Sequence, residues 1–252
     1  MKHERAKSRS IDYDEVSKVY DSVRAGDPEI VHHILQGISL DPHSLVLDVG
    51  CGTANNTRLL ASTIKAKVVG LDISFGMLEK ARRKVEEIPL TQGPASALPF
   101  IDGSFHFVFM TEVLHHLPDI NQALSEIYRV LAPGGSFCIV TQSHEQIDGR
   151  MTSRFFPASA RVDKERYPDI SAIMDSLTRI GFSMVSFKEH QFHPTRLGKD
   201  YLDTVTNRGY SMLHKIRKEE YDRGLNALKA AFAKGEDLLY SAGYTFVRAY
   251  RN

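Results

Sequence analysis

The stretch Val46-Leu47-Asp48-Val49-Gly50-Cys51-Gly52-Thr53-Ala54 decides the fold. It places an apolar run before a Gly-x-Gly turn, and a helical segment follows. Glycine tolerates positive φ and lets a ligand lie directly against the backbone. Amides at the start of a helix then offer donors to a carboxylate. The stretch therefore predicts a strand–turn–helix unit with a ligand at the turn, although a tight turn without a ligand remains the alternative.

Apolar runs that resemble this first strand recur along the chain and alternate with helical segments. Such alternation predicts βαβ units around a parallel sheet. Strands that are apolar along nearly their whole length fit a sheet covered on both faces. The predicted strands are Ser44–Val49, Lys67–Leu71, Ser104–Met110 and Ser136–Thr141. We therefore predict a doubly wound α/β fold.

The helices have readable starts and stops. Asp27-Pro28-Glu29 supplies an N-cap, a proline at the first helical position and an acid in the first turn. Pro133-Gly134-Gly135 ends a helix and turns the chain into the next strand. The predicted helices are Pro28–Leu35, Met77–Val85, Asn121–Leu131 and Asp169–Ile180.

The second half of the chain follows a looser pattern. Residues 142–167 are polar and longer than an ordinary connection, which makes them a functional-loop candidate. Strands are predicted at Phe182–Phe192 and Tyr244–Tyr250. The roughly fifty residues between them carry the helical stripe Tyr221, Leu225, Leu228, Phe232. We predict that the chain divides into an N-terminal cap segment (1–26), an α/β core (27–192), a helical lid insertion (193–242) and a last core strand (243–252).

Asp72 closes the second strand, twenty residues after Gly52. An acid in this place is positioned to accept hydrogen bonds from both ribose hydroxyls of an adenosine ligand. Its alternative role is to cap the next helix, but Ser74 can do that equally well. The spacing favours a nucleoside-containing ligand.

At this point the chain resembles the class I methyltransferases that use S-adenosylmethionine (SAM), especially the small-molecule branch with the ubiquinone/menaquinone-type enzymes. The matching stretches occur in the family's order and cover roughly residues 44–141. They are Val46–Ala54, Val68–Ser74, Leu98–Phe100, Gly103–Phe105, Glu112–Leu117 and Leu131–Gly135. The resemblance implies a Rossmann-like, mostly parallel sheet with an antiparallel last strand, a helical insertion before that strand, and SAM as cofactor.

The resemblance also implies roles for individual residues. The cofactor-binding set is Tyr20, Arg24, Asp48, Gly50, Cys51, Gly52, Asn55, Asp72, Ile73, Met77, Ala97, Leu98 and Thr111. Within it the glycines and Thr111 would line the methionine part, and Asp72 would hold the ribose. His115 and Tyr20 are the catalytic candidates. His115 and His116 are adjacent, so on a helix they do not share one face. One ring would point into the site, and the other would be packed or exposed.

Three departures from the family pattern stand out. Ala54 replaces a third glycine. Pro94 stands where the family often has an acid that accepts from the adenine amino group, so Ser96 or a backbone carbonyl would take that contact. His106 replaces a usual aspartate and is interpreted as structural.

Methyl transfer from a sulfonium is an in-line displacement, for which the protein holds the nucleophile in line and excludes water. We predict a small-molecule acceptor with an O, N, S or C nucleophile. A macromolecular substrate, a non-catalytic SAM-binding regulator and a nicotinamide-dependent oxidoreductase are the alternatives. An oxidoreductase would normally need the third glycine for helix–strand packing, and Asp48 would have no role in it.

The amino-acid composition limits the kinds of partner that the protein is expected to bind. Thirty-two basic and 31 acidic residues give a net charge of +1, which provides no general footprint for nucleic acid. No apolar run approaches a membrane span, and no signal-peptide pattern follows the charged start, so we expect a cytoplasmic protein without a membrane partner. Cys51 and Cys138 are two isolated cysteines, and no metal set is predicted. A homodimer contact is a second interpretation of the helical insertion.

Overall fold

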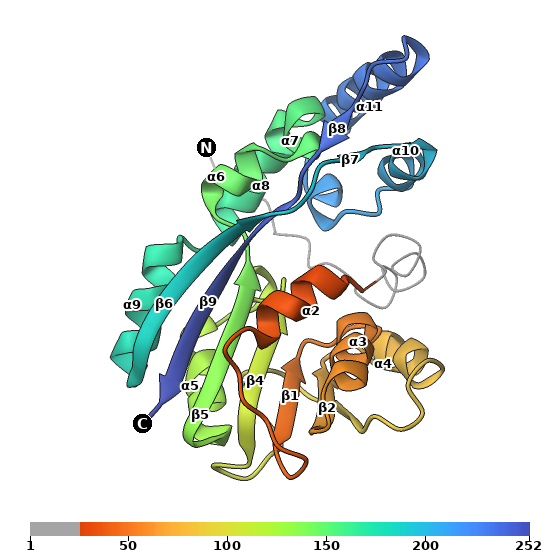
Figure 1. The fold of residues 1–252 in the computed structure, drawn as a ribbon. Coiled ribbons are helices and arrows are strands. Elements are labelled where there is room, and N and C mark those ends of the chain that lie inside the picture. The colour runs from red at the N-terminus through yellow and green to blue at the C-terminus, as the bar shows by residue number, and fades with distance from the viewer. Residues whose placement is uncertain (1–25) are drawn as a thin grey trace, which may run out of the picture.

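The computed structural model describes residues 26–252 and contains a twisted seven-stranded sheet in the order β3-β2-β1-β4-β5-β9-β6 (Figure 1). The strands are β1 Leu45–Val49, β2 Lys67–Asp72, β3 Leu90–Gln92, β4 Phe105–Thr111, β5 Leu131–Thr141, β6 Phe182–Gln191 and β9 Gly243–Arg251. The pairs from β3 to β5 are parallel, whereas β9 runs antiparallel to both β5 and β6. The predicted antiparallel last strand is confirmed, but β6 rather than β9 forms the edge.

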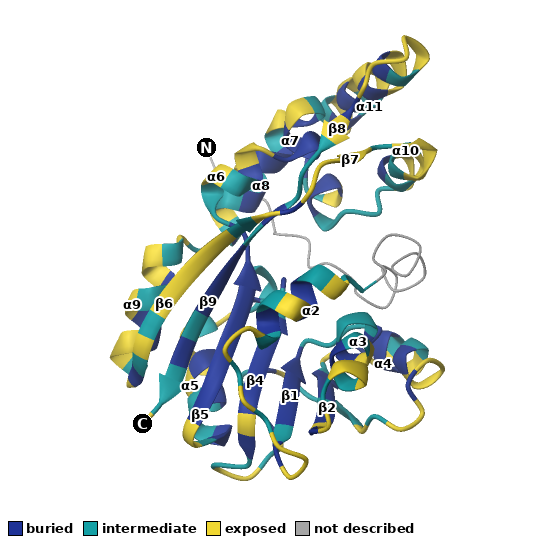
Figure 2. Cartoon of the chain, viewed as in Figure 1, coloured by how far each residue is buried: buried dark blue, intermediate teal, exposed yellow. Residues whose placement is uncertain are grey.

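Helices cover both faces of the sheet. One face packs against α2 (Pro28–Leu35) and α3 (Asn55–Thr63), and the other against α5 (Ile120–Val130) and α9 (Ile170–Ile180). The short α4 (Phe75–Arg82) contacts β2 and β3. Figure 2 shows the central strands buried between these layers. The doubly wound α/β prediction is confirmed.

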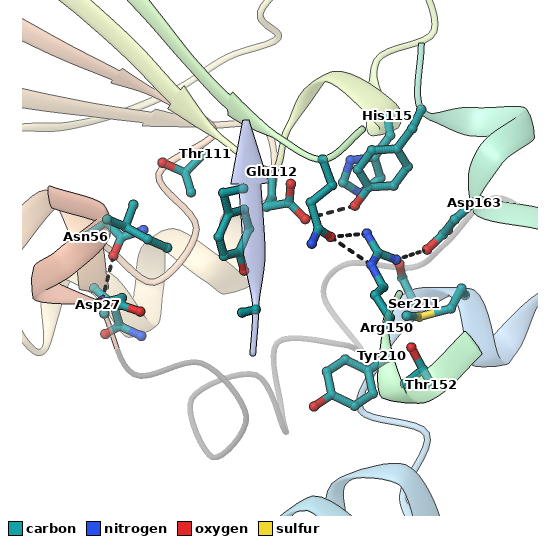
Figure 3. Close-up of a pocket in the computed structure, with 18 of the residues that line it drawn as sticks. Asp27, Asn56, Thr111, Glu112, His115, Arg150, Thr152, Asp163, Tyr210 and Ser211 are labelled. Atoms are coloured by element: carbon teal, nitrogen blue, oxygen red, sulfur yellow. Dashed lines mark hydrogen bonds and ion pairs between the residues drawn. The ribbon is translucent and has the colours of Figure 1, made fainter. Parts of the chain in front are cut away.

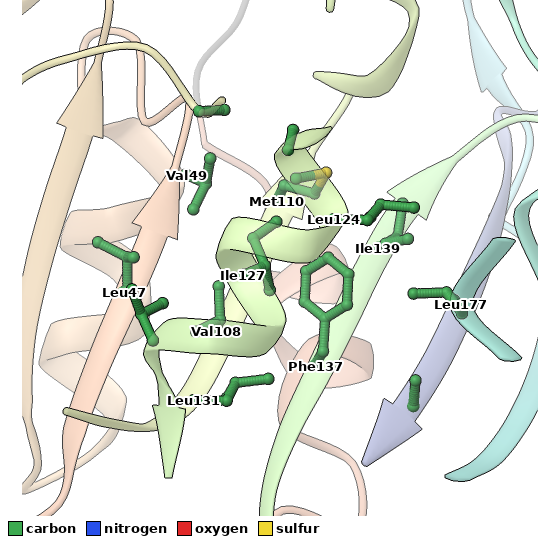
Figure 4. Packing of buried hydrophobic residues seen from close by; sticks show 14 of the residues in the cluster. Leu47, Val49, Val108, Met110, Leu124, Ile127, Leu131, Phe137, Ile139 and Leu177 are labelled. Carbon is green, nitrogen blue, oxygen red and sulfur yellow. The ribbon is translucent and has the colours of Figure 1, made fainter. Parts of the chain in front are cut away.

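Alternating side chains divide the core into two layers. On β4, Phe107 and Phe109 point into the layer under α2, while Val108 and Met110 point into the layer under α5. Figure 4 shows this second layer, where Ile127 of α5 packs among strand residues. Because successive strand residues face opposite sides, a strand covered on both faces must be apolar at nearly every position.

A helical cap stands above the carboxyl ends of the parallel strands (Figure 1). It combines α6 His144–Asp148, α7 Met151–Phe155, α8 Pro157–Arg166, α10 Lys199–Thr206, η2 Ser211–His214, α11 Lys218–Ala233 and the hairpin of β7 Thr195–Arg196 with β8 Leu239–Tyr240. The cap has its own apolar cluster, in which Met151 and Phe156 meet Val205, Tyr221 and Leu228. Residues 151–166 therefore pack with the 193–242 insertion, whereas the sequence places them in the core. The domain boundaries stay a prediction.

Several predicted elements need correction. The polar stretch 142–167 is not a loop but contains the three short helices α6–α8. Leu131 does not end a helix: it begins β5 and pairs with Phe105, with a register shift before the next pair. The helix predicted from Met77 begins at Phe75 because Ser74 accepts a hydrogen bond from Met77 N.

Within residues 26–252, no helix combines the length and the apolar character needed to cross a membrane.

Candidate functional site

A cavity of about 320 Å³ lies where the sheet meets the cap. Its sheet side is formed by the ends of β1, β4 and β5, and its cap side by α7, α8, α10, η2 and β8 (Figure 3). In open α/β sheets ligands bind beyond the carboxyl ends of the strands, where this cavity lies. It joins the glycine-rich turn and the cap in a single space.

The glycine-rich turn is tightly built. Gly50 and Gly52 have φ of 75° and 55°, and Ala54 adopts the same left-handed region with φ of 60°. The amides of Gly50 and Cys51 both donate to the carbonyl of Leu71, at 2.7 and 2.9 Å. A Cβ at Gly50 would lie 2.5 Å from Val113 Cγ2. Glycine is therefore required at position 50 by both backbone conformation and space.

Asp72 ties the end of β2 to this turn. Its carboxylate accepts from the Gly52 amide at 2.8 Å and from the Ser74 amide at 2.9 Å. The apolar side chains next to it are open: Ile73 is 64% exposed and Phe75 is 54% exposed. A carboxylate beside uncovered apolar side chains fits the ribose and the base of a nucleoside.

Asp48 is a buried acid at the cavity wall. The Thr57 hydroxyl donates to its carboxylate at 2.6 Å. Burial raises the pKa of Asp48 to about 7, against the lowering effect of Thr57 and with a smaller contribution from Asp72. A cationic ligand in the cavity would favour the ionised form and relieve this burial cost.

The end of β4 supplies further polar groups. The Thr111 hydroxyl is buried and has no hydrogen-bond partner among residues 26–252. Glu112 has φ of 58°, an unfavourable conformation for a side-chain-bearing residue. Its carboxylate accepts from the Tyr167 hydroxyl at 2.9 Å, and the Tyr167 ring stacks on His115 with centroids 3.9 Å apart. His115 lines the cavity, whereas His116 contacts Arg166.

A buried arginine joins the sheet to the cap. Arg150 forms a 2.5 Å ion pair with Asp163 and donates through Nε to the side-chain Oε1 of Gln142 at 2.8 Å (Figure 3). Its guanidinium lies 5.2 Å from the centre of the Tyr167 ring. Burial by itself would lower the pKa of Arg150, but nearby Tyr167, Glu112 and Asp163 outweigh it and raise the pKa. Arg150 therefore stays charged and holds the cap in place.

Tyrosines dominate the aromatic lining of the cavity. They are Tyr167, Tyr201, Tyr210, Tyr240 and Tyr244. The hydroxyl of Tyr201 is buried without a hydrogen-bond partner in the described part of the chain. Burial raises the pKa of Tyr201 and of Tyr240, so both are neutral phenols. The Tyr201 hydroxyl, with no partner among residues 26–252, can pair with a ligand in the cavity.

The structure brings only part of the predicted site together. The residues that line the cavity are Asp48, Gly50, Cys51, Asn55, Thr111 and His115. Gly52, Asp72, Ile73 and Ala97 lie outside its lining. Met77 and Leu98 are almost fully buried, so their side chains offer little surface to a ligand. Tyr20 and Arg24 lie outside the described residues.

The hydrogen-bonded and ion-paired residues on the cap side were not in the predicted set. Gln142, Arg150 and Asp163 are brought together only by the packing of α7 and α8. The polar character of residues 142–167 was the one feature of the sequence that indicated a functional role for this region. His106 has the expected structural role, because its Nδ1 accepts from Leu45 N at 3.1 Å. Cys51 is partly exposed at the cavity, whereas Cys138 is buried.

The fold and the site define a Rossmann-like protein that binds a nucleoside-containing ligand, and comparison with known proteins specifies the class. A methyltransferase domain model matches residues 47–139. A demethylmenaquinone methyltransferase from Listeria welshimeri is 33% identical over 171 residues, which cover 58% of this chain and 72% of the relative. One from Symbiobacterium thermophilum is 38% identical over 144 residues, covering 52% and 57%. The chain belongs to the class I SAM-dependent methyltransferases.

Solved structures support the fold. A methyltransferase assigned to an antibiotic biosynthesis pathway in Anabaena variabilis superposes with a TM-score of 0.74 at 20% identity, covering 90% of this chain and 98% of the other. A Haemonchus contortus phosphoethanolamine N-methyltransferase, in complex with phosphomonomethylethanolamine and S-adenosylhomocysteine, gives 0.62 at 20% identity, with 94% and 57% covered. The prediction of a SAM-dependent methyltransferase is confirmed, and the oxidoreductase alternative is excluded.

Proposed function

We propose that the protein transfers a methyl group from SAM to a small acceptor with a flat ring, held between the glycine-rich turn and the tyrosines of the cap. The observation that carries this proposal is the single cavity shared by Gly50 and Tyr201. Pockets for small molecules are concave and mostly aromatic or apolar, with a few polar groups that fix orientation. The related enzymes, named for demethylmenaquinone, support an acceptor of the quinone type.

The residues around the turn fit SAM. Asp72 would accept from the ribose hydroxyls, with Ile73 beside the base. The backbone at Gly50 and the Thr111 hydroxyl would contact the methionine part, and the ionised Asp48 would favour its positive charge. SAM supplies an activated methyl group, so the protein's task is to align the acceptor and exclude water.

The acceptor half is enclosed by the cap. Tyr201 and Tyr210 present rings whose centroids are 6.3 Å apart. An aromatic acceptor gains from edge or offset contacts with such rings. Glu112, in contact with Tyr167, and His115 stand on the same wall as groups that can take a proton from a nucleophile. A ring-shaped nucleophile held here would face the cofactor turn.

Replacing Asp72 with alanine is expected to weaken SAM binding ten- to a hundredfold. A hydrogen bond to a charged group contributes about 1.5–3 kcal/mol, and about 1.4 kcal/mol corresponds to tenfold in affinity. Isothermal titration calorimetry with SAM measures the change. The control Asp175→Ala removes an exposed carboxylate on α9 and should leave the affinity unaltered. Unchanged SAM affinity in folded Asp72→Ala would exclude the ribose role.

Tyr201→Phe is expected to raise the KM for the acceptor about two- to tenfold without raising the KM for SAM. The hydroxyl has no partner in the described protein, so its removal leaves stability unchanged or slightly higher. A neutral hydrogen bond to the acceptor contributes about 0.5–1.5 kcal/mol. Steady-state kinetics and thermal unfolding measure both effects, with Tyr250→Phe on β9 as the control.

The acceptor class is tested by incubating the protein with SAM that carries a labelled methyl group. Small hydroquinones, phenols and amines are compared with total protein and RNA as acceptors. We expect label in the small ring compounds. Label found in protein or RNA alone would favour a macromolecular substrate, and SAM binding without transfer to any fraction would favour the regulator.

A further inference from the structure

A cluster of two histidines and one glutamate lies on the α2 side of the sheet. Glu29 and His33 are four residues apart on α2, so they share one face of the helix. His190 comes from β6, the edge strand. Neither histidine lines the cavity described above. The methyltransferase chemistry therefore does not account for this cluster.

The three side chains are already close to a coordinating geometry. One potential ligand atom from each lies within 4.8 Å of the other two. His190 Nε2 is 2.7 Å from Glu29 Oε1, and the rings of His33 and His190 have centroids 3.9 Å apart. A small opening of the Glu29–His190 contact would admit a cation, because ligand atoms around a bound zinc ion lie at about 2.0–2.2 Å from the metal.

The surroundings hold these ligands in place. The His33 ring packs against Phe246 with centroids 5.2 Å apart, and Phe192 lies 4.9 Å from His190. Gln36 forms a side-chain hydrogen bond with His33. Metal-ligating histidines commonly use their other ring nitrogen in such a bond. The side chains of Glu29 and His190 are 39% and 25% exposed, so an ion can reach them from solvent.

We propose that Glu29, His33 and His190 form a binding site for a borderline divalent transition cation such as Zn²⁺. Two imidazoles and one carboxylate are a ligand set that suits zinc and its neighbours, whereas magnesium and calcium prefer oxygen ligands. Three protein ligands leave a fourth position for water. Nearby Lys188 carries a positive charge that opposes a bound cation, so the two imidazoles and the carboxylate must outweigh this repulsion.

The site would join α2 to the edge of the sheet. Gly26 and Asp27, directly before α2, and Ile30 within it line the cavity. Asp27 N also bonds to Asn56 Oδ1 at 3.1 Å, at the start of α3. A metal ion bound at this position would restrain the helix that forms one edge of the cavity entrance. The role assigned to it is structural and does not depend on the identity of the methyl acceptor.

The test is zinc binding to the full chain, purified without a histidine tag. Competition with a chromogenic chelator should give one Zn²⁺ per chain. His33→Gln and His190→Gln should each weaken this binding at least tenfold. Glu29→Gln, a change at a partly exposed position, provides a variant that keeps the packing of His33. Zinc should also raise the melting temperature of the wild type but not that of His190→Gln.

His43→Gln serves as the control, because His43 is an exposed histidine in the loop before β1. Cobalt substitution gives a second readout through the visible bands of a tetrahedral or five-coordinate site. Three results would overturn the proposal: no saturable binding, binding unaffected by the Glu29 and His190 variants, or an equal loss in His43→Gln. None of these results depends on methyl transfer, so they leave the proposed function untouched.

Discussion

Gly50→Ala is expected to reduce SAM affinity at least a hundredfold. The added Cβ would lie 2.5 Å from Val113 Cγ2, a contact that forces either the turn or the segment after β4 to move. Alanine at φ of 75° also costs about 1–2 kcal/mol of backbone strain. The turn is fixed from behind by Leu71, so it can move only toward the cavity. Calorimetry with SAM measures the loss.

Gly134→Ala is the control that separates the effect of the collision from the effect of backbone strain. Gly134 has φ of 76°, yet a Cβ there meets nothing within 4 Å. Alanine at position 134 therefore has the same backbone strain without a collision. Gly134 lies near the start of β5, whereas the cavity lies at the carboxyl end of that strand. We expect it to lower the melting temperature and to leave SAM affinity near the wild-type value. Similar SAM affinities in the two variants, both folded, would contradict the role given to the turn.

The central strands were predictable because their environment is simple. A strand covered on both faces must be apolar at nearly every position, so Val46–Val49 and Phe107–Met110 stand out in the sequence. The three-residue β3 has no such signal, because none of its positions is fully buried. The helices α6 and α7 have five residues each, too few for a 3.6-residue repeat to be recognised.

The cofactor half and the acceptor half of the site also differ in how far the sequence predicts them. The cofactor half depends on local sequence, since Gly50 lies directly after β1 and Asp72 directly ends β2. The acceptor half depends on tertiary packing: Arg150 meets Gln142 eight residues away and Asp163 thirteen residues away. Tyr201 comes from another part of the cap. Polar residues in a stretch without a clear periodic pattern do not show which of them will meet, so the cluster of Arg150 with Gln142 and Asp163 was not predictable.

Gly224 lies inside helix α11, and tertiary packing explains why a glycine is needed there. A glycine inside a helix costs about 1 kcal/mol relative to alanine. On α11, however, a Cβ at Gly224 would lie 2.4 Å from Phe156 Cδ1 and 2.5 Å from the Phe155 carbonyl. The glycine lets α11 lie directly on α7. Since Met151 and Thr152 of α7 line the cavity, this contact sets the position of one acceptor wall.

Gly224→Ala is therefore expected to lower methyl transfer at least tenfold, while SAM affinity stays within about twofold. The helices must separate, which displaces α7 and the acceptor wall, and a displacement of about 1 Å at a reacting site is enough to cost two orders of magnitude in rate. The glycine-rich turn lies across the cavity and keeps its own contacts. Single-turnover transfer and calorimetry measure the two quantities.

Asn226→Ala is the matched control, because position 226 lies on the exposed face of the same helix. It raises helix propensity without a collision, so stability should rise slightly and transfer should stay unchanged. Replacing residues 193–242 with a short turn extends the test: transfer should disappear while some SAM binding remains. If Gly224→Ala or the shortened protein transfers methyl groups at the wild-type rate, the cap is not part of the active site. If SAM binding falls together with transfer, the cap also supports the cofactor half.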